Sequence, residues 1–298
     1  MVSETVESRR YTRAAADAVP RPAISDRPPA VVAPIAYHAR TPFRPRYHAN
    51  DLTRDLLTLE PHDMTIVDAR PAGAELEVEG FKLVAHRSAV SDFRDAAQVA
   101  AIHGDEIREL LLDLTGADVV TVGGRAILRF GERDKTSGML DNSRPARFAH
   151  VDMSADTARA FAGRAIAQDP ALAGRTVRRF AYYNVWRSFS GAPQDVPLAL
   201  CDGRSVADGD LLAADAVFDV AGQPDWSFEG WVAAYNPAHR WSYFRDMTPG
   251  EVIVFKTAES EAGRVSRVPH VAFDDPSCPE GTQPRASVEM RGTAYWFD

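Results

Sequence analysis

The chain has 298 residues, of which 45% are hydrophobic, so it can bury a large core in one or two domains. Its formal net charge of −8 argues against a nucleic acid partner, which favours a basic surface. No apolar run approaches the roughly 18 residues of a membrane span and no apolar signal core opens the chain, so we expect a cytoplasmic protein that does not bind membranes.

The first part of the chain divides into a tail and a mixed segment. Residues 1–30 combine Ala, Arg, Pro and acids without periodicity, which predicts a flexible tail. Residues 31–130 are expected to form a strand and helix flank. Its strands lie near MTIVDA and ELEVEGFKLVAH, and a helix follows that starts near Ser91 and stops at Gly116.

Short strands dominate the second part, from about residue 118 to residue 298. They alternate with turns such as DGRS, YNPAH and TPGE, and only SADTARAFAGRAIAQ has helical character. Many short strands of this kind predict a sandwich or jelly roll. We therefore expect one mainly β domain over residues 31–298, with flanking helices around a double-stranded β-helix, the cupin-like form of the jelly roll.

A histidine and an acid stand two positions apart in the predicted strand RFAHVDMS. Because successive strand side chains point to opposite faces, His150 and Asp152 share one face, while Val151 lies on the other. An imidazole nitrogen and a carboxylate oxygen so placed can bind one divalent cation. A sheet with a solvent-exposed polar face explains the same pattern without a metal.

The His-x-acid pattern is weak evidence by itself. The chain has 8 His and 42 acidic residues, so about one such pair is expected by chance, and two occur. The other pair is His103 and Asp105, next to a run of leucines at helical spacing. We interpret this pair as structural, with Asp105 as a helix cap or first-turn acid.

A third ligand is expected from His270, in the predicted strand segment RVPHVAFDDP. Two histidines and one carboxylate on one side of a cation leave positions open, as in non-haem Fe(II) enzymes that bind O₂ and a co-substrate. Zinc hydrolases can use similar ligands. The sequence therefore predicts a metal site at His150, Asp152 and His270, with the metal itself still open.

The segment PRASVEMRG offers a partner for an anion. Arg285, Ser287 and Arg291 alternate with apolar residues and share a strand face. A guanidinium and a hydroxyl together suit a carboxylate, because arginine offers a bidentate fork and serine adds one donor. An ordinary amphipathic strand with its charges in water is the alternative explanation.

Together, the HxD pair, a distant histidine and the Arg-x-Ser pair resemble the signature of Fe(II)/2-oxoglutarate-dependent dioxygenases. The resemblance is closer still to a hydroxylase/desaturase family of secondary metabolism that includes gibberellin desaturase-like and cephamycin hydroxylase-component-like proteins. Its matching stretches cover most of the chain beyond the tail: GFKLVAHRSAVSDF, LTGADVV, RPARFAHVDMS, NVWRSFSGAPQDVPLALCD, HRWSYFRDM, EVIVFK and PHVAFDDP.

The resemblance implies a jelly-roll enzyme that uses Fe(II), 2-oxoglutarate and O₂ to hydroxylate or desaturate a small molecule, either a natural product or derived from an amino acid. It implies that Arg285 and Ser287 hold the distal carboxylate of 2-oxoglutarate. Arg187 is a candidate second anion ligand, and Arg291 or Arg187 would take the role of Arg285 if Arg285 does not hold the co-substrate. Tyr243 is a candidate hydroxyl donor to the co-substrate. Asn184 and Trp186 should share the strand face opposite Arg187.

Three other functions remain open at this point. An iron oxidase would use O₂ without 2-oxoglutarate, for desaturation or oxidative cyclisation, and its Arg285 would contact the substrate. A zinc or manganese enzyme or a non-catalytic binding protein could share the fold. The two cysteines, Cys201 and Cys278, lack metal-type spacing and are expected to be free thiols in a reducing compartment.

Overall fold

The computed structural model describes residues 29–298. The predicted tail at residues 1–30 lies outside this part of the chain except for its last two positions, and Ala30 already begins the first strand. Both predicted cysteine thiols are free, which confirms that expectation.

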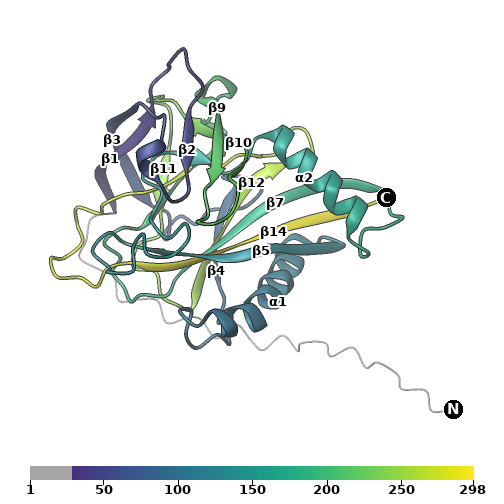
Figure 1. Cartoon of the computed structure of the whole chain (residues 1–298). Coiled ribbons are helices and arrows are strands. Elements are labelled where there is room, and N and C mark those ends of the chain that lie inside the picture. The colour runs from purple at the N-terminus through teal and green to yellow at the C-terminus, as the bar shows by residue number, and fades with distance from the viewer. Residues whose placement is uncertain (1–28) are drawn as a thin grey trace.

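Two sheets make up the body of the protein (Figure 1). The larger sheet contains, in spatial order, β1 (Ala30–His38), β3 (Leu59–Asp68), β11 (Trp241–Tyr243), β8 (Leu198–Cys201), β13 (His270–Ala272), β6 (His150–Val151), β10 (Trp226–Ala233), β9 (Leu211–Phe218) and β2 (Arg46–His48). The smaller sheet contains β4 (Phe81–Ala85), β12 (Glu251–Glu259), β7 (Val177–Ser188), β14 (Ala286–Phe297) and β5 (Val119–Phe130). Short 3₁₀ turns lie at Leu52–Arg54, Gly203–Ser205 and Asp208–Asp210.

The inner faces of the two sheets pack against each other. The Phe255 ring of the smaller sheet lies 4.7 Å from the His270 ring of the larger one, measured between centroids. Leu198 and Leu200 of β8 share a buried cluster with Trp186 of β7 and Phe255 of β12. The metal-site residues therefore lie between two sheets, where water is largely excluded.

Helix α1 (Ala96–Thr115) covers the outer face of the smaller sheet, below β5 and β14 in Figure 1. Val99, His103, Ile107 and Leu111 are buried at four-residue intervals along it, and Ile107 and Leu111 share a buried cluster with Val120 of β5 and Met290 of β14. The helix ends where predicted, because Gly116 takes the left-handed conformation that closes a helix.

The start of α1 differs from the prediction. Asp95, and not Ser91, caps the helix by accepting hydrogen bonds from the backbone N–H groups of Ala97 and Gln98. Asp105 lies in the middle of the helix, where it pairs with Arg108, so its assignment as a cap or first-turn acid is wrong. The apolar four-residue spacing already begins at Val99, and the helix continues through Gly104 because its buried face is uninterrupted.

Helix α2 (Ala155–Gln168) forms where the sequence predicted it. The Ser154 hydroxyl caps it by accepting a hydrogen bond from the Thr157 N–H. Its buried alanines, Ala158 and Ala162, share a cluster with Met153. The helix thus begins three residues after Asp152 and fixes the chain that leaves the metal site.

The segment before residue 118 contributes strands to both sheets. β3 pairs in parallel with β11, which joins Ile66 to Trp241, and β4 pairs with β12 at the edge of the smaller sheet. The predicted flank is therefore hydrogen-bonded into the same sheets as the predicted core.

Gly230 allows a close approach beside the metal site. A Cβ atom there would lie 2.8 Å from the Asp152 carbonyl oxygen and 3.0 Å from the Tyr47 hydroxyl. Both distances are shorter than van der Waals contact, so any larger residue would displace β10 or the ligand segment.

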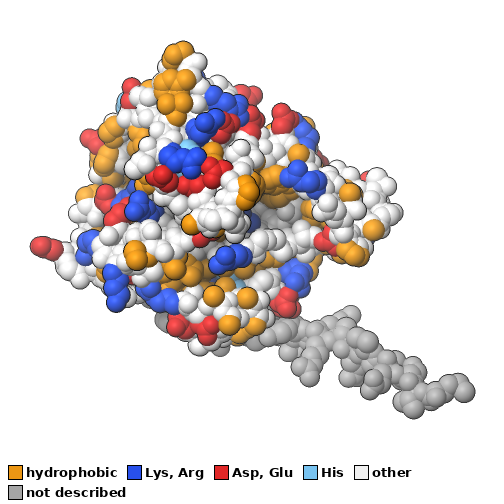
Figure 2. Space-filling model, in the orientation of Figure 1, with side chains coloured by type: hydrophobic (Ala, Val, Ile, Leu, Met, Phe, Trp, Pro, Cys, Tyr) orange, Lys and Arg blue, Asp and Glu red, His pale blue; other side chains and the backbone are white. Residues whose placement is uncertain are grey.

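On the surface seen in Figure 2, acidic and basic side chains are interspersed, without one dominant charge.

Candidate metal centre

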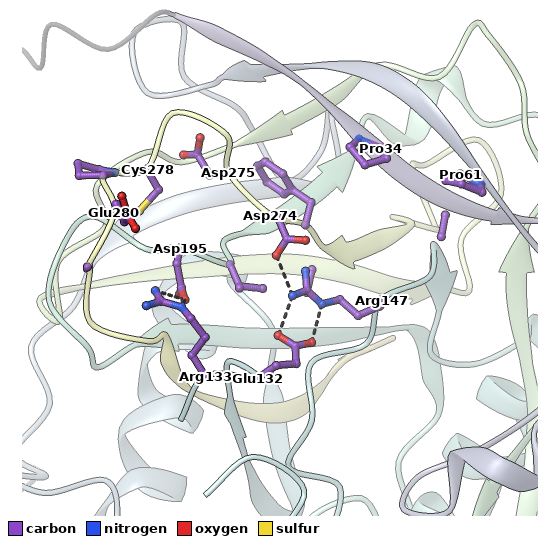
Figure 3. Close-up of a pocket in the computed structure, with 16 residues that line it drawn as sticks. Pro34, Pro61, Glu132, Arg133, Arg147, Asp195, Asp274, Asp275, Cys278 and Glu280 are labelled. Carbon is purple, nitrogen blue, oxygen red and sulfur yellow. Dashed lines mark hydrogen bonds and ion pairs between the residues drawn. The ribbon is translucent and has the colours of Figure 1, made fainter. Parts of the chain in front are cut away.

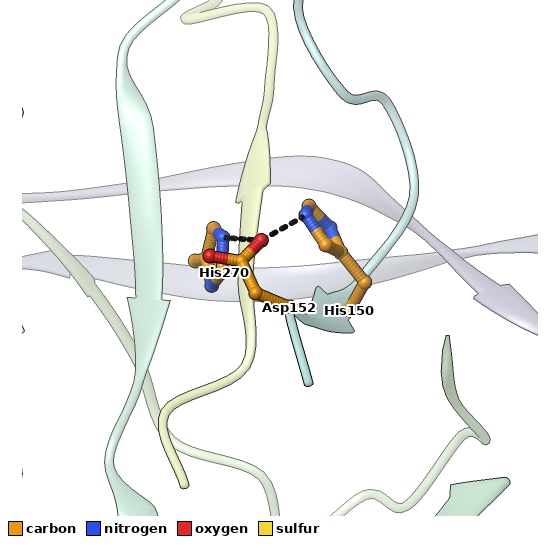
Figure 4. Close-up of side chains that lie close together, drawn as sticks. All are labelled: His150, Asp152 and His270. Atoms are coloured by element: carbon orange, nitrogen blue, oxygen red, sulfur yellow. Dashed lines mark ion pairs between the residues drawn. The ribbon is translucent and has the colours of Figure 1, made fainter. Parts of the chain in front are cut away.

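The structure brings His150, Asp152 and His270 together (Figure 4). β13 pairs with β6 so that His270 lies directly opposite His150, although 119 residues separate them in the chain. Asp152 follows β6 on the same face, while Val151 points into the opposite cluster, as the alternation predicted. One ligand atom from each residue lies within 4.8 Å of the other two.

Distances between the ligand atoms suit a shared cation. Asp152 Oδ1 lies 3.7 Å from His150 Nε2 and 3.8 Å from His270 Nε2, too far for hydrogen bonds. Two ligands that are each about 2.1 Å from one ion lie at most about 4.2 Å apart. The three side chains are almost entirely buried, so the site is screened from bulk water.

Backbone carbonyls fix the orientation of both imidazoles. His150 Nδ1 donates to the carbonyl oxygen of Phe148 at 3.0 Å, and His270 Nδ1 donates to that of Val268 at 3.1 Å. A carbonyl oxygen only accepts, so the proton of each neutral ring is on Nδ1 and the lone pair is on Nε2. Both lone pairs are thus available to a metal, the usual outer-shell arrangement for ligating histidines.

The two oxygens of Asp152 have different partners. Oδ1 faces the histidines, whereas Oδ2 accepts a hydrogen bond from Asn184 Nδ2 at 2.6 Å and pairs with Arg291 Nη2 at 3.2 Å. Arg291 also contacts Glu289 at 3.1 Å, which holds the guanidinium in place. Asn184 and Arg291 therefore orient Asp152 so that one oxygen remains for a metal.

Charge states at the site favour metal binding. Burial and the charge of His270 lower the pKa of His150 to about 3, and burial also lowers the pKa of His270. Burial alone would raise the pKa of Asp152, but the charges of Arg291 and the two histidines lower it well below its ordinary value. Near neutral pH the site therefore offers two neutral imidazoles and one carboxylate, without protons to displace.

Two adjoining cavities meet at the triad. A recess of about 20 Å³, the size of a bound water, is lined by all three ligands, Trp186 and Arg285. A cavity of about 500 Å³ is lined by His150, Asp152 and a largely apolar wall, and its volume suits a small-molecule ligand. We call these the inner recess and the access cavity.

Arg285 lies beside the inner recess, as its predicted role requires. Its side chain is 1% exposed, Nη1 donates to the Val196 carbonyl oxygen at 2.8 Å, and Nε has no partner among residues 29–298. Burial, followed by the charges of Arg129 and Arg147, lowers the pKa of Arg285 to about 9. A buried guanidinium without an acidic partner is suited to an anionic ligand.

Ser287 and Arg291 face the same side of β14 as Arg285, as predicted. Ser287 Oγ donates to the Arg129 carbonyl oxygen at 3.3 Å and thus fixes β5 to β14. Arg291 is occupied by Asp152 and Glu289. Arg291 is therefore engaged by two carboxylates, whereas no carboxylate among residues 29–298 pairs with the Arg285 guanidinium.

The prediction for Arg187 as an anion ligand is wrong. It lies on the outer face of β7, where its guanidinium donates to the carbonyl oxygens of His86 and Pro249 and lies over the Phe93 ring. Asn184 and Trp186 occupy the inner face, as the alternation predicted. Strand geometry therefore directs Arg187 away from the metal.

Tyr243 does not line the inner recess or the access cavity. Its ring belongs to the cluster on the outer face of the larger sheet and contacts the Phe273 ring edge-on at 5.5 Å. The predicted hydroxyl contact to a co-substrate is therefore wrong, because the side chain points away from the metal ligands.

A third, more open cavity of about 1060 Å³ lies next to the access cavity (Figure 3). Arg147 and Glu132 line both and form a bidentate ion pair with two distances of 2.7 Å. Arg147 also reaches Asp274 at 2.9 Å. These three side chains separate the access cavity from the outer one.

Sequence reasoning gave no role to Asn184, Arg129 or Glu289. Asn184 was placed on the correct face, but its contact with Asp152 depends on how the two sheets are stacked. Arg129 of β5 and Glu289 of β14 line the inner recess without belonging to any motif. Only strand alternation could have indicated that they point inward.

Replacing Asn184 with alanine is expected to weaken Fe(II) binding by about tenfold to a hundredfold, because Asp152 loses the hydrogen bond that orients it. Anaerobic titration of Fe(II) against a competing chelator measures the dissociation constant. Asn236→Ala is a matched control, since that amide donates to Asp210 at 2.9 Å, away from the triad. Equal Fe(II) affinity in Asn184→Ala and the wild type would contradict the positioning role.

Comparison with known proteins places the chain in a family. A family model described as an oxidoreductase/YMDC permease-like domain matches residues 33–295. The hydroxylase/desaturase CTB9 of Cercospora beticola is 30% identical over 75% of this chain and 72% of its own length. The hydroxylase/desaturase efuI of Hormonema carpetanum is 28% identical over 83% of this chain and 87% of its own length. The Fe(II)/2-oxoglutarate-dependent dioxygenase nvfI of Aspergillus novofumigatus is 27% identical over 78% of this chain and 82% of its own length.

The chain belongs to the hydroxylase/desaturase family of Fe(II)/2-oxoglutarate-dependent oxygenases. This membership confirms the resemblance inferred from the sequence and makes the protein an oxidoreductase.

Solved structures support the jelly-roll fold that is expected of this family. The iron and alpha-ketoglutarate-dependent endoperoxidase NvfI superposes with a TM-score of 0.77 at 22% identity, covering 92% of this chain and all of its own. The mainly β jelly-roll prediction is thereby confirmed. Within residues 29–298, no helix is both long and apolar enough to cross a membrane.

Proposed function

We propose that this hydroxylase/desaturase binds Fe(II) through His150, Asp152 and His270 and oxidises a C–H bond of a small molecule at the expense of 2-oxoglutarate and O₂. The proposal rests on the convergence of one ligand atom from each of three side chains. The second polar atom of each side chain is already engaged in a hydrogen bond. Three protein ligands on one side leave positions open for a co-substrate, as in other facial-triad sites.

The bound iron would supply oxygen activation: 2-oxoglutarate loses CO₂ and becomes succinate with one oxygen atom of O₂, while the other atom enters the substrate as a hydroxyl or leaves as water on desaturation. The chain supplies position and environment. Asn184 and Arg291 orient Asp152, and the two facing sheets exclude water from the reacting atoms.

Arg285 is proposed to bind the distal carboxylate of 2-oxoglutarate. Its unpartnered Nε and its place on the wall of the inner recess support this role. The recess has room for about one water, so the co-substrate would also occupy the adjoining part of the access cavity. Ser287, on the same face of β14, is proposed to assist either directly or by holding β5.

The proposal extends to substrate and location. The access cavity supports a small organic molecule as the substrate, and we propose no nucleic acid partner. Two free cysteines, of which Cys201 is buried, support a reducing compartment such as the cytoplasm.

Anaerobic reconstitution with Fe(II) and 2-oxoglutarate tests the proposal. We expect the weak visible charge-transfer band of the iron complex with 2-oxoglutarate, and succinate release once O₂ is admitted. Succinate also separates this function from the iron oxidase that uses O₂ alone, which would turn over without releasing it. A wild-type protein that binds Fe(II) but shows no band and releases no succinate would contradict the proposal.

A further inference from the structure

Arg129 is a cation of the metal site that has no assigned partner. It lies on β5, lines both the inner recess and the access cavity, and donates through Nη1 to the backbone carbonyl of Arg144. No carboxylate pairs with it anywhere in residues 29–298. Burial lowers the pKa of Arg129, and the opposing charge of Glu289 does not reverse this shift.

The acidic residues that line the two cavities are already engaged. Asp152 and Glu289 both contact Arg291, at 3.2 and 3.1 Å. Glu132 pairs with Arg147 at 2.7 Å, and Asp55 pairs with His48 at 3.2 Å. None of these carboxylates therefore pairs directly with Arg129.

A count of charges in the loaded site leaves one cation uncompensated. The two charges of Fe(II) and the two of 2-oxoglutarate cancel, and Arg285 is proposed to hold the distal carboxylate of the latter. The carboxylates of Asp152 and Glu289 balance two of the three positive charges on Arg129, Arg285 and Arg291, so one positive charge remains. With Arg285 buried and Arg129 half-buried beside the metal, an additional anion would lower the cost of desolvating these guanidinium groups. This surplus stands out in a chain whose net charge is −8.

The remaining wall of the access cavity is mainly apolar. Aromatic rings of Tyr47, Phe148, Phe218 and Phe228 line it together with leucines from residues 52–59. The Tyr47 and Phe148 rings contact each other at 5.1 Å and both face His150. An occupant of this cavity therefore meets mostly apolar surface, and of the two guanidinium groups nearest the metal ligands, Arg291 is already paired with Asp152 and Glu289 while Arg129 has no carboxylate partner.

We propose that Arg129 binds a carboxylate of the organic substrate, so that the enzyme selects apolar, mainly aromatic or aliphatic molecules with one carboxylate. The inference rests on the proposed function, because it assigns Arg285 to the co-substrate. The planar guanidinium fork suits a carboxylate by two parallel hydrogen bonds. It also positions the molecule, since Arg129 and the metal ligands share one recess.

The test compares an anionic probe with its neutral counterpart. 2-Naphthoate and 2-naphthamide have the same ring and nearly the same shape, and they are titrated anaerobically by calorimetry into protein that holds Fe(II) and 2-oxoglutarate. We expect the wild type to bind naphthoate at least about tenfold more tightly, as one charge-assisted contact would give. Arg129→Gln should abolish this preference, Arg129→Lys should restore part of it, and Arg187→Gln, which removes a guanidinium from the opposite face of the smaller sheet, should keep it.

Other outcomes would overturn the inference. It fails if the wild type does not bind naphthoate more tightly than naphthamide, or if Arg129→Gln keeps the preference. It also fails if Arg129→Gln weakens 2-oxoglutarate binding as strongly as Arg285→Gln does, because Arg129 would then serve the co-substrate. The charge-transfer band separates the two proposals: its absence from the wild type contradicts the proposed function, whereas its presence without a carboxylate preference contradicts only the role of Arg129.

Discussion

His270→Ala is expected to lower Fe(II) affinity more than about a hundredfold and to remove turnover. Loss of a group that only orients a metal ligand typically costs ten- to a hundredfold in affinity, so loss of a ligand should cost more. His270 is also the one ligand that comes from β13. Without it, only His150 of β6 and the following Asp152 remain, and the ion would have no protein ligand on the side that faces β13. Iron content after anaerobic loading and chelator competition measure the effect.

His239→Ala provides the control for a lost buried imidazole. His239 bonds to Asp210 at 3.2 Å and to the Tyr37 hydroxyl at 3.2 Å, and it lies apart from the triad. This variant should lose thermal stability but retain wild-type Fe(II) affinity. If His270→Ala were to keep one tightly bound iron per chain, the assignment of the third ligand would be wrong.

Arg285→Gln is expected to raise the dissociation constant of 2-oxoglutarate by about tenfold to a hundredfold, while iron binding is retained. A hydrogen bond to a charged group contributes about 1.5–3 kcal/mol, and 1.4 kcal/mol corresponds to tenfold in affinity. Glutamine keeps a donor near the Val196 carbonyl oxygen but loses the charge and the fork. Titration of 2-oxoglutarate into the anaerobic Fe(II) protein, followed by the visible band, measures the change.

Arg187→Gln is the matched control, because it removes a buried guanidinium from the opposite face of the smaller sheet. It should leave the 2-oxoglutarate dissociation constant unchanged, although the loss of its bonds to His86 and Pro249 should lower the melting temperature. An unchanged dissociation constant in Arg285→Gln would show that another cation of the recess holds the co-substrate.

Strand alternation carried most of what the sequence predicted correctly. It placed His150 and Asp152 on one face, Arg285, Ser287 and Arg291 on another, and Asn184 opposite Arg187, because a period of two is a local property of any strand. The helix stop at Gly116 and the helical character of SADTARAFAGRAIAQ were also predicted correctly, because both signals are local.

What the sequence could not give depends on contacts between distant segments. The predicted strand around RFAHVDMS contains only two residues of regular strand, which pair with β10 at two positions and with β13 at His270 alone. Arg187 has the residue type of an anion ligand, but a neighbouring loop at His86 and Pro249 already supplies its acceptors. The role of Asn184 required knowing which strand lies across from Asp152, and local patterns do not report sheet stacking.

The direct pairing of His270 with His150 has a consequence for biosynthesis. During translation, the segment that carries His150 and Asp152 is synthesised well before β13, which carries His270. β13 also pairs with β6 and β8, so it can take its place only beside strands that have already been made. A growing chain therefore has no complete site for iron, and the ion can be captured only after translation has passed residue 270.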